Sequence, residues 1–171
     1  MARPALTHVG HDGAPAMVDV SAKAVTPRAA VARGHVTVSG VARRLVRTGA
    51  VAKGDPLNVA RVAGIQAAKR TSALIPLCHP LLVGAVLVNF RIEDTWVEVE
   101  AAVDTVDRTG VETEALHACA IAGLTIYDMC KSADRGMVIG EVALWEKTGG
   151  RSGTYRRSAN VASVVTKVVE S

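Results

Sequence analysis

The chain has 171 residues, 49% of them hydrophobic and 21% charged, which predicts one domain with a substantial core. Aromatic residues make up only 3%, so Val, Ala, Leu and Ile must build that core, and we expect oligomerisation to add stability. The formal net charge of +4 favours an anionic partner. Because the basic residues are dispersed and aromatic rings are few, a small phosphorylated ligand is favoured over nucleic acid.

The cysteines and the first residues of the chain predict a cytoplasmic protein. Cys78, Cys119 and Cys130 include no CxxC pair, which argues against a disulfide framework or a structural zinc site and indicates a reducing compartment. No apolar run approaches the roughly 20 residues of a membrane helix, and the N-terminus lacks a signal-peptide pattern. We expect a flexible arm over 1–16, a single domain over 17–157 and a mobile tail over 158–171.

Hydrophobic periodicity predicts the order of the elements. Asp55 and Pro56 are start signals for the longest helix of the first half. In chain order the pattern predicts a strand or extended segment over 17–23, a strand over 35–39, helices over 41–48 and 57–71, a hairpin over 86–92 and 97–100 with one buried face, a helix over 111–132 and a strand over 137–144. The order βαββαβ is typical of an α+β, ferredoxin-like sandwich with helices on one face of an antiparallel sheet.

A stiff turn separates the longest helix of the first half from the hairpin. Pro76 and Pro80 exclude regular helix there and restrict the backbone around Cys78 and His79. The turn therefore holds a titratable imidazole in a rigid position. From these residues alone, a structural histidine and a functional one are equally well supported.

Two acidic residues of the helix over 111–132 cannot easily serve one small site in one chain. Glu114 and Asp128 differ by about 40° in azimuth but by roughly 21 Å along the axis. Either they serve different purposes, or one site takes one residue from each of two subunits. Asp128 can also pair with Lys131, and the apolar neighbours of this pair indicate partial burial. The pair is then either catalytic or an ordinary salt bridge at the helix end.

Two glycine-containing segments could bind an anion. Lys53 stands beside Gly54 just before a helix start, where backbone amides favour negative charge. Residues 149–153 (GGRSG) could wrap a phosphate, although a surface turn explains these five residues as well. Asp19 and Lys23 are expected to be solvated charges. No nucleotide-binding or zinc-protease motif is present in the sequence.

Several of these segments together resemble one family, the molybdenum cofactor biosynthesis protein C family of cyclic pyranopterin monophosphate synthases. The matching stretches are MVDVSAK (17–23), KGD (53–55), ARVAGIQAAKRTSALIPLCHPL (60–81), TGVETEAL (109–116), LTIYDMCK (124–131), MVIG (137–140) and, more weakly, KTGGRSG (147–153). The resemblance implies a ferredoxin-like homo-hexamer, a trimer of dimers with sites between subunits. It also implies conversion of a cyclic dihydro-GTP intermediate to cyclic pyranopterin monophosphate, with release of pyrophosphate.

Carried over by position, the resemblance implies a set of site residues. Asp128 and Lys131 match the catalytic acid/base pair, and Lys53 matches a second active-site lysine. The segments that match substrate contacts contain Leu77, Cys78, His79, Thr113 and Glu114, with Glu112 nearby. The family commonly has Met at the position of Thr113, so a contact through the backbone would survive here, whereas a side-chain contact would not.

The reaction that the resemblance implies accounts for these residue types. Rearranging a purine-derived ring moves several protons, which calls for a general base such as Asp128 and for further acids. Departing pyrophosphate calls for cations, for which Lys53, Lys131, Lys69 and Arg28 are candidates. His79 would position the substrate or carry a proton. We expect no tightly bound cofactor, although Mg²⁺ could accompany the phosphates.

Three other interpretations are weighed beside the enzyme. A ferredoxin-like module could sense a nucleotide without turnover, since the fold hosts many functions. An RNA-binding domain would expose aromatic rings on central strands, whereas Phe90 is in phase with the buried face of its strand. A diverged paralogue would keep the fold and lose the activity, which the intact motifs argue against.

Overall fold

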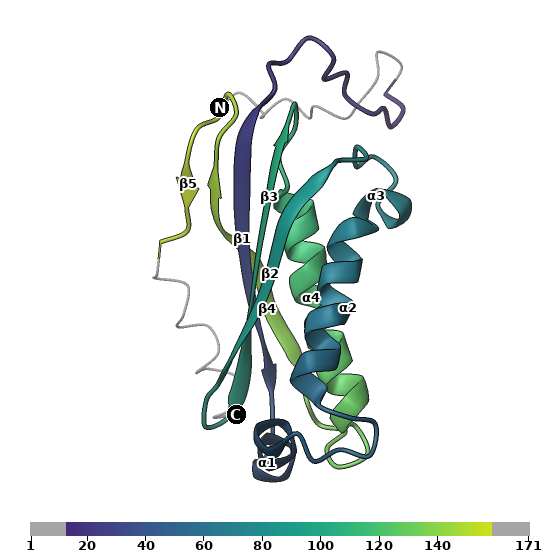
Figure 1. Ribbon diagram of the computed structural model, residues 1–171, viewed down its shortest axis with the longest axis vertical. Coiled ribbons are helices and arrows are strands. Elements are labelled where there is room, and N and C mark those ends of the chain that lie inside the picture. The colour runs from purple at the N-terminus through teal and green to yellow at the C-terminus, as the bar shows by residue number, and fades with distance from the viewer. Residues whose placement is uncertain (1–12, 159–171) are drawn as a thin grey trace.

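A computed structural model describes residues 13–158 of the chain (Figure 1). The strands are β1 (Thr26–Thr37), β2 (Val83–Ile92), β3 (Trp96–Asp107), β4 (Ile139–Thr148) and β5 (Tyr155–Arg156). The helices are α1 (Gly40–Thr48), α2 (Pro56–Lys69), α3 (Thr71–Leu74) and α4 (Glu112–Cys130). The predictions for residues 1–12 and 159–171 lie outside the described part of the chain.

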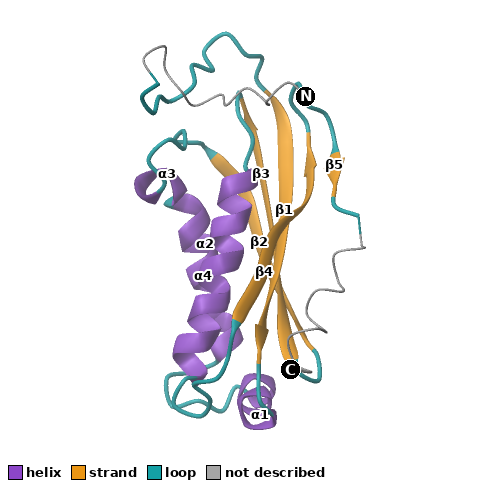
Figure 2. Cartoon of the chain, turned by 180° about the vertical axis from the view of Figure 1, so that it is seen from behind, coloured by secondary structure: helices purple, strands orange, loops and turns teal. Residues whose placement is uncertain are grey.

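The sheet has the order β2-β3-β1-β4-β5, and its paired strands are antiparallel. Helices α2 and α4 lie side by side on one face of this sheet, while the other face carries no helix (Figures 1 and 2). This arrangement confirms the α+β, ferredoxin-like fold. Within residues 13–158, no helix combines the length and apolarity needed to cross a bilayer.

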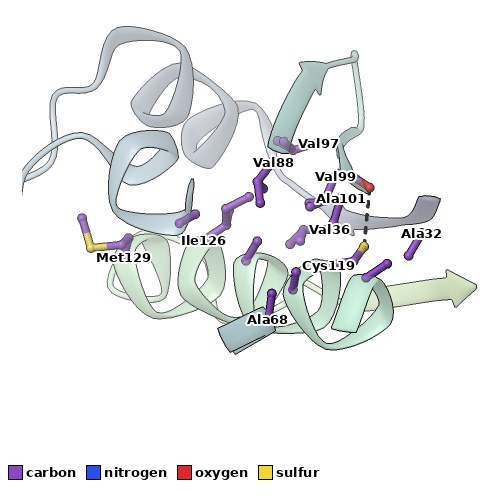
Figure 3. Packing of buried hydrophobic residues seen from close by; sticks show 14 of the residues in the cluster. Ala32, Val36, Ala68, Val88, Val97, Val99, Ala101, Cys119, Ile126 and Met129 are labelled. Atoms are coloured by element: carbon purple, nitrogen blue, oxygen red, sulfur yellow. Dashed lines mark hydrogen bonds between the residues drawn. The ribbon is translucent and has the colours of Figure 1, made fainter. Parts of the chain in front are cut away.

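Small aliphatic side chains build the core between the helices and the sheet (Figure 3). Val36, Val88 and Val99, which come from three different strands, and Ile126 of α4 all belong to this core, and all four are at most 1% exposed. Gly64 allows α2 to approach α4 closely, because a Cβ there would lie 3.0 Å from the carbonyl oxygen of Ala118. The helices can therefore pack tightly with few large residues.

Several predicted bounds are wrong at their edges. Strand β1 begins at Thr26 instead of His35, and β4 extends to Thr148. The first part of β1 carries Pro, Arg, Ala and Gly residues of low β-propensity, and its pairing with β3 and β4 overrides that preference. Helix α2 ends at Lys69, and the separate turn α3 follows. Residues 17–23 form no strand, and 21–23 form a turn, so the strand prediction for this segment is wrong.

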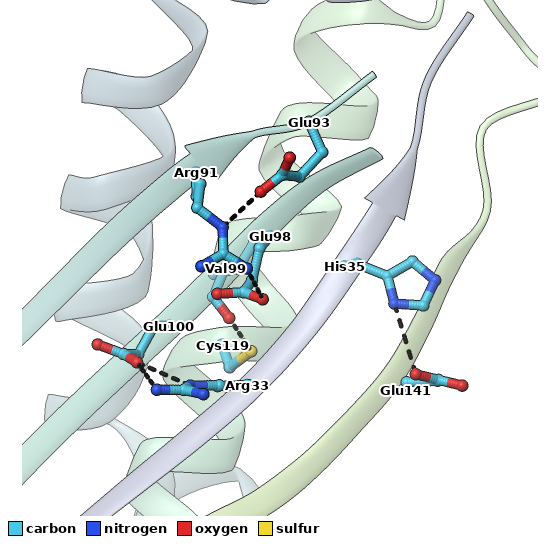
Figure 4. A network of polar contacts seen from close by, with 9 residues as sticks. All are labelled: Arg33, His35, Arg91, Glu93, Glu98, Val99, Glu100, Cys119 and Glu141. Atoms are coloured by element: carbon cyan, nitrogen blue, oxygen red, sulfur yellow. Dashed lines mark hydrogen bonds and ion pairs between the residues drawn. The ribbon is translucent and has the colours of Figure 1, made fainter. Parts of the chain in front are cut away.

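The face of the sheet without helices is lined by ion pairs (Figure 4). Arg33 binds Glu100 at 2.7 Å, and Arg91 binds Glu98 at 3.0 Å across neighbouring strands. Phe90 is half-buried on the opposite face, where the Arg61 guanidinium lies 5.5 Å from its ring centroid. Phe90 is thus not a free stacking platform.

Candidate active site

A compact group of charges lies at the C-terminal end of α4. Lys131 Nζ lies 2.7 Å from Asp128 Oδ1, and Lys53 Nζ lies 3.2 Å from Asp128 Oδ2. Lys53 also donates to the backbone oxygen of Asp128 at 3.3 Å. Two lysines from separate segments therefore bracket one carboxylate. We call these three residues the lysine–aspartate group.

Charge and exposure define the chemistry of the lysine–aspartate group. Hydrogen bonds from Lys131 and then Lys53 lower the pKa of Asp128, and Asp128 in turn raises the pKa of Lys131. Asp128 is therefore an unprotonated carboxylate at neutral pH. The predicted partial burial is wrong for the single chain, because the Asp128 and Lys131 side chains are 52% and 50% exposed.

The loop before α2 positions Lys53. Gly49 closes α1 at φ 65°, and Gly54 adopts φ 107°, a conformation that favours glycine. Asp55 then caps α2 by accepting from the amides of Leu57 and Asn58 at 2.9 and 3.2 Å. Because Asp55 already occupies these two amides, an anion at this end would depend on the lysine side chains and not on the helix start.

A second group of titratable side chains lies at the N-terminal end of α4. Cys78 Sγ donates to Glu114 Oε1 at 3.3 Å, while Glu114 Oε2 is buried without a hydrogen-bond partner among the described residues. Glu114 is only 2% exposed, and burial raises its pKa. Burial, followed by the Glu114 charge, raises the pKa of Cys78 to about 11. Burial at this end therefore disfavours the charged forms of both groups.

His79 faces a cleft next to this end. Its Nε2 lies 2.8 Å from the backbone oxygen of Val18, so the proline-flanked turn contacts the segment 17–23. The cleft has a volume of about 460 Å³ and is also lined by Asp19, Asp107 and Arg108. His79 shares this cleft with Arg108 and Thr109, just before the start of α4, whereas the lysine–aspartate group lies at the other end of that helix.

A larger cleft, of about 600 Å³, is lined by three cationic residues: Lys23, Arg28 and Arg151. Arg28 is fixed there by donating to the backbone oxygens of Asp107 and Arg108 at 2.9 and 3.0 Å. Gly149 and Gly150 have φ of 86° and 71°, and a Cβ at either would overlap Pro27 or Arg28. The glycines thus bring the GGRSG turn against β1 and complete the basic cleft.

Comparison with known proteins decides the family. The MoaC family matches residues 17–150. The chain belongs to this family. The cyclic pyranopterin monophosphate synthase of Thermomicrobium roseum is 57% identical over 159 residues, covering 92% of this chain and 96% of the relative. Cyclic pyranopterin monophosphate synthase 1 of Mycobacterium tuberculosis H37Rv is 55% identical, covering 91% and 92%. The synthase of Heliobacterium modesticaldum is 54% identical, covering 89% and 97%.

The site residues expected for a MoaC family member fall into two groups within one chain. The lysine–aspartate group contains Lys53, Asp128 and Lys131. The other end holds Leu77, Cys78, His79, Glu112, Thr113, Glu114 and the exposed Lys69 at the end of α2. About 21 Å of helix separates Glu114 from Asp128. One chain does not bring all these residues to one small molecule.

Sequence reasoning did not name Lys23 as a site residue, and for the segment with Arg151 it left open both a phosphate loop and a surface turn. Lys23 and Arg151 line the basic cleft beside Arg28, although they stand far apart in the chain. The available signal was the pair Gly149-Gly150 directly before Arg151, since consecutive glycines indicate a close backbone approach. No local pattern connects that turn to Lys23.

Proposed function

We propose that this chain converts 3',8-cyclo-7,8-dihydro-GTP to cyclic pyranopterin monophosphate with release of pyrophosphate, a lyase step of molybdenum cofactor biosynthesis. One observation carries the proposal. A chain 57% identical to a named synthase carries a lysine-bound carboxylate of lowered pKa and a buried carboxyl group of raised pKa at the two ends of one helix. Proton transfers in both directions need such a pair.

The two carboxyl groups take different roles in this proposal. Asp128 is ionised by its lysines and accepts a proton from the substrate as the purine-derived ring rearranges. Glu114, whose pKa is raised by burial, donates a proton at another ring atom. Cys78 donates to Glu114 and so fixes the orientation of the carboxyl group. Residues Leu77, Glu112 and Thr113 border this end and complete the substrate contacts.

Cations stabilise the leaving group. As the cyclic phosphate closes, the bond between the α-phosphorus and pyrophosphate breaks, and negative charge develops on the departing oxygen. Lys53 and Lys131 offer two ammonium groups at one end, and the basic cleft offers Lys23, Arg28 and Arg151 at the other. Among residues 13–158 no His, Cys, Asp and Glu side chains are grouped to hold a metal ion. In our proposal Mg²⁺, where it takes part, arrives with the phosphates.

We also propose that the working form is a hexamer, a trimer of dimers, in which one site takes its two ends from two subunits. The separation of the two groups by roughly 21 Å supports this assembly, because a small substrate cannot span it within one chain. The exposed lysine–aspartate group would then be enclosed by a partner subunit. A cytoplasmic location is part of the proposal and is supported by the free thiols of Cys78, Cys119 and Cys130.

The decisive assay is incubation of the purified protein with the cyclic dihydro-GTP intermediate, measuring pyrophosphate and cyclic pyranopterin monophosphate together. We expect both products from the wild-type chain and neither from Lys53→Ala. Binding of the intermediate with no product would overturn the enzyme and support a nucleotide sensor. Unimpaired turnover by Lys53→Ala would remove that lysine from the mechanism.

Mixing subunits tests the shared site. Asp128→Asn and Glu114→Gln disable opposite ends, so a mixed dimer regains one intact site of its two. After subunit exchange, equal mixing restores about a quarter of the wild-type activity if half of the dimers are mixed. Activity that stays at the sum of the two parents would mean that each chain uses its own residues.

A further inference from the structure

His79 forms a hydrogen bond to the backbone of Val18, and the chain that follows Val18 leads to the basic cleft. The Nε2 atom lies 2.8 Å from the backbone oxygen of Val18, and this contact is partly buried. Because a carbonyl oxygen only accepts, Nε2 must carry the proton. That nitrogen cannot deliver its proton to a substrate while it holds Val18. The contact therefore favours a positioning role for this ring.

The segment that accepts this bond is short and internally fixed. We call residues 17–23 the N-terminal strap. Asp19 accepts from the Ser21 amide at 2.8 Å and from the Ser21 hydroxyl at 2.7 Å, which forms a tight turn directly after Val18. The Lys23 amide then donates to the Val20 oxygen at 3.0 Å. Two consecutive turns thus connect the His79 contact to Lys23 with little slack.

Lys23 is the end of the strap and the start of the basic cleft. It lines that cleft together with Arg28 and Arg151. Arg28 lies on β1 and Arg151 on the GGRSG turn, whereas Lys23 lies outside any strand or helix. Figure 1 shows the segment before β1 crossing the end of the molecule above α3. A cation on such a segment needs an anchor to stay in the cleft.

We propose that His79 is a positioning residue, which clamps the N-terminal strap through Val18 and thereby holds Lys23 in the basic cleft to bind the phosphates of the substrate. The proposal rests on the proposed function for the identity of those phosphates. His79 then contributes to phosphate affinity, not to proton transfer. The rigid turn between Pro76 and Pro80 serves this purpose, since it fixes the ring that fixes the strap.

Two amide substitutions separate the positioning role from proton transfer. Gln places its amide N–H near the position of Nε2, whereas the shorter Asn places it near Nδ1, out of reach of Val18. Neither side chain titrates. Inorganic pyrophosphate serves as the probe of the cleft, with affinity measured by calorimetry for His79→Gln, His79→Asn, Lys23→Ala and the double variant His79→Asn/Lys23→Ala. Arg91→Ala removes one positive charge on the open sheet face and corrects for net charge.

We expect Lys23→Ala to weaken pyrophosphate binding roughly tenfold or more, as for a charge-assisted hydrogen bond. His79→Asn should weaken it by a similar factor, the double variant should be no worse than either, and His79→Gln should recover most of the affinity. In the turnover assay, His79→Asn should raise KM more than it lowers kcat. Trypsin should cleave after Lys23 faster in His79→Asn than in His79→Gln.

The opposite results overturn the proposal. If both amide variants lose kcat while pyrophosphate affinity stays at the wild-type value, the ring transfers a proton. Additive losses in the double variant would mean that His79 and Lys23 act independently. Thermal unfolding identifies a variant that fails to fold. If His79→Asn is such a variant, the wild type is compared with His79→Gln instead. A wild-type chain without turnover would fail the proposed function, while the pyrophosphate and trypsin results would still test the clamp.

Discussion

The two ends of α4 carry carboxyl groups whose pKa values are shifted in opposite directions. Glu114, near the N-terminal end, is 2% exposed, and burial raises its pKa. Asp128, near the C-terminal end, has a side chain that is 52% exposed, and the neighbouring lysines lower its pKa. The same helix thus carries a carboxyl group of raised pKa at one end and a carboxyl group of lowered pKa at the other.

The direction of both pKa shifts opposes the helix dipole, which shows which effect dominates. A dipole stabilises negative charge at the N-terminus and destabilises it at the C-terminus by about 0.3–1 kcal/mol. Glu114 would then have a lowered pKa and Asp128 a raised one. Burial at Glu114 and paired cations at Asp128 reverse both expectations. Local surroundings, and not position on the helix, assign the acid and the base.

The largest expected effect is that of Asp128→Asn. The substitution keeps the shape and removes the base, so we expect kcat to fall by roughly 10²–10⁴-fold, as for loss of a general base. The lowered pKa of Asp128 means that its lysine pairs stabilise the fold at pH values above 3.8, the ordinary pKa of the group. The variant loses these pairs and should therefore also unfold at a slightly lower temperature at pH 7. Product formation and thermal unfolding measure the two effects.

A charge control keeps this result specific to the lysine–aspartate group. Arg44 lies on α1 at the same end of the molecule and is exposed. Arg44→Ala therefore changes the local charge without removing a member of the group, and kcat should stay close to wild type. An equal loss of kcat in Arg44→Ala would mean that the overall charge at this end of the molecule causes the effect. Asp128 would then have no specific role as the base.

We expect Glu114→Gln to raise the free energy of unfolding, whereas Asp128→Asn should lower it. A folded-state pKa above the ordinary 4.5 means that the stability contributed by the protonated group is lost as pH rises through the folded pKa. A neutral amide avoids that loss, so the variant should be more stable than wild type at pH 8 and show no gain at pH 4. Activity should fall roughly tenfold or more, because Gln has no proton to give.

Urea unfolding between pH 4 and pH 8 checks this prediction, with Glu112→Gln as the matched variant. Glu112 lies two residues away in the same first turn and is only half-buried. Its substitution should change the pH dependence of stability less, because the Glu112 charge is the smallest of the causes that act on the Glu114 pKa. A gain for Glu112→Gln equal to that for Glu114→Gln, or no gain for either, would contradict a raised pKa of the buried Glu114.

The sequence predicted the fold and the large distance between Glu114 and Asp128, but it did not predict the surroundings of the site. The spacing of Glu114 and Asp128 along one helix was readable from the helix rise alone, and so was the cap at Asp55. Burial of Asp128 was inferred from its apolar neighbours, and it is wrong because those neighbours point into the core while the carboxylate points outward. Periodicity shows which side of a helix a residue lies on, but it does not show whether solvent or another part of the domain lies next to that side.

The basic cleft lay beyond sequence reasoning for a related reason. Lys23 and Arg151 meet only because β1 runs between them and the sheet order places β4 next to β1. Register of this kind depends on tertiary pairing, and the early part of β1 has the composition of a loop. The helices, which are defined by local capping and periodicity, were therefore predicted well, and the contacts between distant loops were not.

The smallest expected effect uses Cys78 as a reporter of the charge on Glu114. Burial and then the Glu114 charge raise the pKa of this thiol to about 11, so it should react slowly with iodoacetamide at pH 8. Glu114→Gln removes the charge and leaves the burial, so alkylation should accelerate by roughly threefold to tenfold. Asp128→Asn changes a charge at the far end of α4 and should leave the rate unchanged.

Peptide mass spectrometry of the alkylated protein separates the three thiols. Cys119 and Cys130 are at most 1% exposed and should stay unmodified in the folded chain, which controls for unfolding. A Cys78 rate in the wild type equal to that of a free thiol, or no acceleration in Glu114→Gln, would mean that Glu114 is already neutral without influence on its neighbour. Acceleration in Asp128→Asn as well would mean that the two ends of α4 are electrically coupled, and the acid and base could not then be assigned independently.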